Sequence, residues 1–137
     1  MWKYYALLSA VFASLTALFS KMGVKGIDSN LATALRVSFI LVLVWGIAFM
    51  SGAVREVREI APRTLLFLFL SAVATGLSWL FYFKALQLGD VSKVAPIDKL
   101  SVPLTILLSI LLLGESVSLK VILGGALITA GSLVLLL

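Results

Sequence analysis

The 137-residue chain contains neither cysteine nor histidine. It therefore cannot form disulfides, carry out thiol redox chemistry, build the usual His- or thiolate-based zinc sites or use histidine in acid–base catalysis. Charge is also scarce: 12% of the residues are charged and 62% are hydrophobic, against about 25% and roughly 45–50% in a soluble domain. A soluble fold of this length cannot bury so much apolar surface, so the sequence predicts an integral membrane protein.

Charged residues separate five long apolar segments. A span needs about 20 apolar residues, so five spans leave room for loops and six leave almost none. The apolar runs do not alternate with polar residues as the strands of a membrane barrel do. We predict an all-α integral membrane protein with five transmembrane helices in one domain, 1–137. The expected helices are 4–22, 32–51, 64–86, 92–113 and 119–136.

The charged segment 54–60 lies between the second and third expected helices. Arg55 and Glu59 are four residues apart, a spacing that would suit a short interfacial helix. We expect a solvated loop instead and keep the interfacial helix as the alternative. The net charge of +5 does not indicate nucleic-acid binding, because the basic residues are spread over loops and helix ends rather than gathered on one face.

Five spans place the two termini on opposite sides of the membrane. The N-terminal side carries five basic residues, and the other side carries three to five, depending on whether Arg36 and Lys84 snorkel to it. The positive-inside rule favours the N-terminal side as cytoplasmic, but only weakly. Such a balance is expected of a chain that inserts in both orientations, and insertion in one orientation is the alternative.

Two adjacent charges, Asp98 and Lys99, lie six to seven residues into the fourth expected helix, about 10 Å deep at 1.5 Å per residue. Charges at that depth cost several kcal/mol unless they are paired or face water. Ser101 and Thr105 continue a polar stripe from Asp98 on the same helix face. The chain also has Pro96 and Pro103 here, which permit kinks and predict a helix hinge. Loosened backbone beside buried charge is typical of a transport path.

Other polar and aromatic residues are candidates for the same site. Lys84 and Arg36 would contact substrate or simply snorkel, and Trp79 and Tyr82 would form an aromatic wall or anchor the chain at the interface. The small residues of the last helix predict packing against a second copy; they are Gly124, Gly125, Thr129 and Gly131. We find no nucleophile–base pair, metal cluster or phosphate loop, so we expect neither enzyme activity nor a bound cofactor or metal.

Several motifs are similar to those of EamA-type domains of the drug/metabolite transporter superfamily. They are Phe19-Ser-Lys-Met-Gly-Val-Lys-Gly-Ile-Asp28, Ala34-Leu-Arg36, Tyr82-Phe-Lys-Ala-Leu-Gln-Leu-Gly-Asp-Val-Ser-Lys-Val-Ala-Pro-Ile97 and Leu113-Gly-Glu115, with the Gly-rich last helix. The resemblance covers nearly the whole chain. It implies a five-helix half of a ten-helix protein whose two halves are inverted, with substrate held between them. This chain has one such half.

The composition and the resemblance together predict a transporter in the inner membrane of a prokaryote. It would pair with itself as an antiparallel homodimer, or with an inverted homologous chain, and export or exchange small metabolites, amino acids or drugs by alternating access. Asp98 would bind a cationic group or carry a proton, and Lys99 would bind a carboxylate, which favours a zwitterion. The alternatives are a helper subunit without transport activity and a flippase for lipid-linked substrates.

Overall fold

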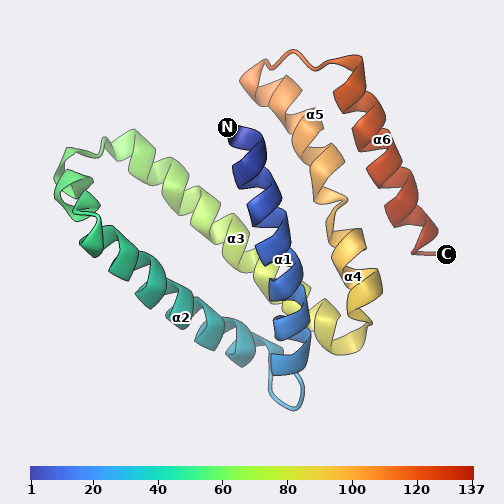
Figure 1. The fold of residues 1–137 in the computed structure, drawn as a ribbon, viewed down its shortest axis with the longest axis horizontal. Helices are drawn as coiled ribbons and strands as arrows, with labels where there is room; N and C mark the ends of the chain where they lie inside the picture. The colour runs from blue at the N-terminus through green and yellow to red at the C-terminus, as the bar shows by residue number, and fades with distance from the viewer. The chain divides into compact units, whose positions relative to one another are not determined.

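The computed structural model describes residues 1–137 and contains helices, turns and no strand. The chain order, drawn in Figure 1, is α1 (Trp2–Gly23), α2 (Ser29–Met50), the 3₁₀ helix η1 (Ala53–Glu59), α3 (Pro62–Leu88), α4 (Val91–Asp98), α5 (Ser101–Leu113) and α6 (Leu119–Val134). The predicted ends of the first, second, third and last helices lie within three residues of the observed ends.

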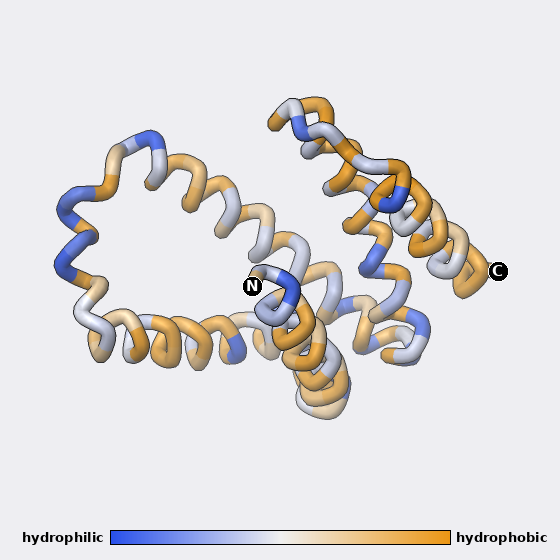
Figure 2. The backbone as a smooth tube through the Cα atoms, turned by 45° about the horizontal axis from the view of Figure 1, so that its top comes forward, coloured by the Kyte–Doolittle hydropathy of each residue, from blue (hydrophilic) through white to orange (hydrophobic).

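The helices are apolar along most of their length, and hydrophilic residues gather at the connections and helix ends (Figure 2). Four segments are long and apolar enough to span a membrane: α1, α2, α3 and the combined segment Val91–Leu113. The remaining helix, α6, has 16 residues and is a shorter apolar helix. Most large apolar side chains lie on the surface of the single chain. This exposure would be unfavourable in water and suits a protein surrounded by lipid.

The chain forms two compact units, one of Met1–Leu18 with Leu88–Leu137 and one of Phe19–Gln87. In the second unit, the end of α1, the start of α2 and the end of α3 meet around buried Val24, Phe83 and Leu86. From this packed end, α2 and α3 separate as they run toward η1 (Figure 1).

Polar contacts at the helix ends hold this packed end together. The Lys21 ammonium donates to the Leu86 carbonyl at 2.6 Å, so a cation sits against the last turn of α3, where the helix dipole favours it. The Gln87 amide donates to the Ile27 carbonyl at 2.7 Å. Asp28 caps α2 by accepting from the backbone N–H groups of Asn30 and Leu31, at 2.9 and 3.0 Å.

The prediction of one continuous helix over 92–113 is wrong at residues 99 and 100, where α4 ends and α5 has not begun. Pro103 explains the break. It has no N–H to donate to the Lys99 carbonyl, and a proline ring clashes with the carbonyl four residues before it. In the observed structure Pro103 is the third residue of α5, where a backbone N–H would have no helical partner anyway.

The prediction of a loop over 54–60 is also wrong, because Ala53–Glu59 forms the 3₁₀ helix η1. It follows Gly52, whose φ of 76° provides the left-handed turn after α2. A 3₁₀ helix has three residues per turn, so side chains three apart are aligned. The sequence thus produces an apolar row of Val54 and Val57, a basic row of Arg55 and Arg58, and an acidic row of Glu56 and Glu59.

Cysteine scanning of 54–59 should reveal this three-residue period, since the chain has no native cysteine. In nanodiscs, a membrane-impermeant thiol reagent should label Val54→Cys and Val57→Cys slowly, because their row would face the bilayer, and the other four positions quickly. Labelling rates are the measurement. Uniform rates along the segment would indicate the solvated loop instead.

Candidate functional site

The α4–α5 break carries the two deep charges predicted for the transport path. Lys99 Nζ lies 3.4 Å from Asp98 Oδ2, and the Lys99 and Asp98 side chains are 54% and 38% exposed. The pair lies at the end of α4, seven residues after its first residue, Val91. Pairing lowers the cost of placing charge at membrane depth. Because the single chain leaves both side chains accessible, the pair is open to a ligand or to a second protein surface.

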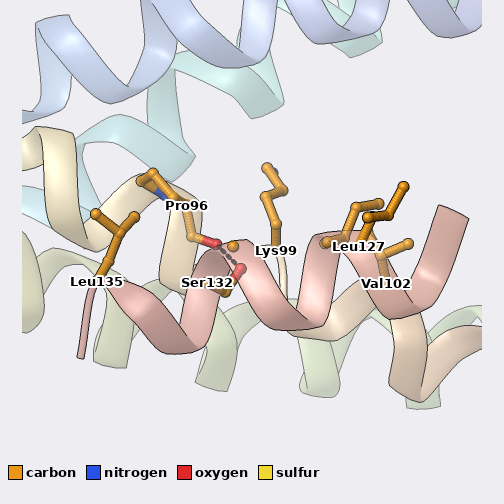
Figure 3. A pocket seen from close by; sticks show the side chains of 8 residues that line it. Pro96, Lys99, Val102, Leu127, Ser132 and Leu135 are labelled. Atoms are coloured by element: carbon orange, nitrogen blue, oxygen red, sulfur yellow. Dashed lines mark hydrogen bonds between the residues drawn. The ribbon is translucent and has the colours of Figure 1, made fainter. Parts of the chain in front are cut away.

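The last turn of α4 is fastened to α6 by a hydrogen bond. In a regular helix the Pro96 carbonyl would accept from the N–H of Leu100, but that N–H donates to Ile97 instead, at 3.0 Å. The hydroxyl of Ser132, 4% exposed, donates to the Pro96 carbonyl at 2.9 Å (Figure 3). The Lys99 N–H also donates to this carbonyl, at 3.0 Å. The carbonyl oxygen that loses its usual donor at the break therefore has two others, one from its own turn and one from α6.

A pocket of about 420 Å³ lies between this region and α6. Its lining residues are Pro96, Lys99, Val102, Leu127, Ile128, Gly131, Ser132 and Leu135. The Lys99 side chain extends between Leu135 on one side and Val102 with Leu127 on the other (Figure 3). The pocket is thus apolar apart from one cation and one hydroxyl, a lining that suits a molecule with an apolar part and a negative group.

Helix α6 also packs closely on α5. A Cβ at Gly125 would lie 3.0 Å from Ile106 Cδ1, closer than ordinary van der Waals contact, so a larger residue there would require the Ile106 side chain to shift. Gly125, predicted to pack against a second copy, is thereby engaged within its own chain. Gly124 and Gly131 have open space beside them, and the Thr129 hydroxyl donates to the Gly125 carbonyl at 2.8 Å. Packing of these residues against another chain stays a prediction.

The polar stripe predicted from Asp98 onward is divided by the break, because Asp98 ends α4 and Ser101 begins α5. Within α5, the Thr105 hydroxyl donates to the Ser101 carbonyl at 2.8 Å and the Ser109 hydroxyl to the Ile106 carbonyl at 3.0 Å. These hydroxyls bond to their own helix, as serine and threonine commonly do. The straight-helix register that united Asp98, Ser101 and Thr105 does not hold across the break.

The other predicted site residues lie in the Phe19–Gln87 unit. The Arg36 guanidinium lies 4.3 Å from the centre of the Trp79 ring and 5.6 Å from that of Phe83, a cation–π contact between α2 and α3. Lys84 lies elsewhere on α3 and donates to Gln87 Oε1 at 3.4 Å. Arg36 and Trp79 are brought together, and Phe83 is a partner that the sequence analysis did not identify.

Comparisons with known proteins identify the family of the chain. All of the chain, residues 1–137, matches the model of the EamA-like transporter family. The chain belongs to that family. A protein of Sinorhizobium sp., described as "Uncharacterized transporter in cobO 3'region", is 49% identical over 134 residues, which cover 98% of this chain and 95% of that protein. No solved structure matches. The resemblance inferred from the sequence is confirmed, and this EamA-family chain is a membrane transporter in the general sense.

Removing the Ser132 hydroxyl should destabilise the protein. In Ser132→Ala the Pro96 carbonyl loses its donor from α6 but keeps the Lys99 N–H, so the expected cost is that of one hydrogen bond, about 0.5–1.5 kcal/mol. The measurement is the free energy of unfolding in detergent micelles. Ser38→Ala is the matched control, because the exposed Ser38 hydroxyl donates to Ala34 within its own helix. Equal stability of the two variants would contradict the role given to Ser132.

Proposed function

We propose that this chain is one half of an alternating-access transporter that works as an antiparallel homodimer in the inner membrane of a prokaryote. The observation that carries the proposal is the broken helix with Asp98 and Lys99 at the break. In membrane proteins, irregular backbone at depth is tolerated where it is buried in protein or lines a water-filled cavity. Discontinuous helices of this kind form substrate and ion sites in transporters with inverted repeats.

Three observations support the half-transporter. The single chain leaves the Asp98–Lys99 pair and most of its apolar surface accessible. The Sinorhizobium relative is nearly the same length as this chain. The basic residues are almost balanced between the two sides expected from five spans, with α6 as the short fifth span. A second copy, or an inverted homologous chain, would bring a second broken helix to a shared cavity.

The proposed substrate is a small zwitterion such as an amino acid, exported or exchanged. Lys99 would bind its carboxylate, and Asp98 its ammonium group or a coupling proton. The apolar lining beside Lys99 would receive the side chain. Pro96 and Pro103 flank the break and would form the hinge about which α4 and α5 move. Arg36 and Trp79 contact each other between α2 and α3, so we propose that they hold these two helices together rather than bind substrate.

A second candidate is a helper subunit without transport activity. The 3.4 Å pairing of Asp98 with Lys99 favours it, because an ion pair that becomes buried against another membrane protein can specify one packing arrangement without any ligand. A flippase for lipid-linked substrates is the third candidate, supported by the apolar lining of the pocket beside Lys99. Flux measurements on the purified chain distinguish these candidates.

Dual orientation predicts partial labelling from outside the cell. Glu56→Cys places a single thiol on the exposed acidic row of η1, without background from native cysteine. A membrane-impermeant reagent applied to intact cells should label about half of the molecules, with total thiol measured after lysis. Labelling of essentially all or none would mean one orientation, and the antiparallel homodimer would then be ruled out.

Charge removal at the break should abolish transport. In proteoliposomes of the purified protein, Asp98→Asn and Lys99→Gln should each reduce amino-acid flux by about tenfold or more, because each removes a charged contact to the substrate. Glu115→Gln, in the turn between α5 and α6, is the control and should keep its flux. Unchanged flux in Asp98→Asn would refute the carrier role, and no flux from the unaltered protein would favour the helper subunit.

A further inference from the structure

A second pocket, of about 380 Å³, lies between the start of α2 and the last third of α3. Its lining residues are Asp28, Ser29, Asn30, Leu77, Leu80, Phe81 and Lys84. The polar members come from the first turn of α2 and from Lys84, and the apolar members come from α3 alone. The pocket therefore has a polar end and an apolar wall.

The polar end lies at the level expected for lipid headgroups. Asp28 is the N-cap of α2, and Lys84 is four residues before the end of α3. Ends of spanning helices lie near the boundary of the hydrocarbon. Phe81 and Leu77 are three and seven residues before Lys84, so the apolar wall extends about 10 Å farther inward at 1.5 Å per residue. The pocket thus runs from headgroup level into the acyl-chain region.

The two charges of the pocket remain available to a ligand. Both backbone N–H groups that Asp28 caps donate to its Oδ1, which leaves Oδ2 without an intramolecular donor. The Lys84 ammonium makes one long contact, 3.4 Å to Gln87 Oε1, and Gln87 in turn donates to the Ile27 carbonyl. The sole ion pair of the structure is Asp98 with Lys99. Asp28 and Lys84 therefore line one pocket without neutralising each other directly.

We propose that this pocket binds a phospholipid whose zwitterionic headgroup carries a primary ammonium, the phosphatidylethanolamine class. Lys84 contacts the phosphate, Asp28 accepts from the ammonium, and an acyl chain lies along Leu77 and Phe81. An anionic headgroup meets repulsion from Asp28 and provides no cation for it. A choline headgroup is zwitterionic but has no N–H to donate. This site shares no residue with the Asp98–Lys99 break and does not depend on transport.

The test is lipid retention by the purified full-length protein. The protein is exposed to an equimolar mixture of phosphatidylethanolamine, phosphatidylcholine and phosphatidylglycerol, and bound lipid is identified by native mass spectrometry. The unaltered protein should retain phosphatidylethanolamine several-fold over the other two. Asp28→Asn should bring retention to the ratio of the mixture, and Lys84→Gln should lower retention of all three lipids, because each carries the phosphate that Lys84 contacts. Asparagine caps helices as well as aspartate does, so Asp28→Asn removes the charge and keeps the cap.

Lys25→Gln is the matched control, because Lys25 lies in the same α1–α2 connection but does not line the pocket. It should keep the selectivity of the unaltered protein. Equal retention of the three lipids by the unaltered protein would overturn the proposal without any variant. Preference for phosphatidylglycerol would overturn the pairing with Asp28. Unchanged selectivity in Asp28→Asn together with undiminished retention in Lys84→Gln would place lipid binding elsewhere.

Discussion

The constraint on which the α4–α5 region depends is that every backbone polar group inside a membrane needs a partner within the protein. Pro103 denies the Lys99 carbonyl its helical donor, and the register then shifts so that Leu100 donates to Ile97. That shift leaves the Pro96 carbonyl without its usual donor, and the Lys99 N–H and the Ser132 hydroxyl donate to it instead. The break is therefore stabilised by a hydrogen bond from α6.

The Phe19–Gln87 unit meets the same constraint in a different way. Its polar contacts lie at helix ends, where the last carbonyls and first N–H groups have no helical partners. Lys21 contacts the Leu86 carbonyl, and Asp28 accepts from the first turn of α2. The long apolar stretches beyond this end make few contacts within the chain and are left for lipid or for another protein surface.

The helix positions could largely be predicted from sequence, because spans lie where charge is absent and connections lie where charged residues gather. The weak point of the fourth helix was also visible, since proline has a known steric effect on the carbonyl four residues before it. The role of Ser132 as a partner of the Pro96 carbonyl could not be predicted, because Ser132 is one more small residue of the last helix until α6 is known to pack against α4. The engagement of Gly125 with Ile106 and the 3₁₀ period of η1 likewise depend on packing and backbone geometry that composition does not determine.

In the proposed transporter, the Asp98–Lys99 pair also bears on how the protein changes conformation without substrate. An unpaired charge moving through a low-dielectric region costs several kcal/mol, whereas a paired charge costs much less. When a zwitterion binds between the two side chains, its ammonium replaces Lys99 as the partner of Asp98, and its carboxylate replaces Asp98 as the partner of Lys99. The local net charge is therefore zero with and without substrate. Both states could then reorient at similar cost, as exchange and release each require. A substrate carrying one net charge would not preserve that balance without a coupling proton at Asp98.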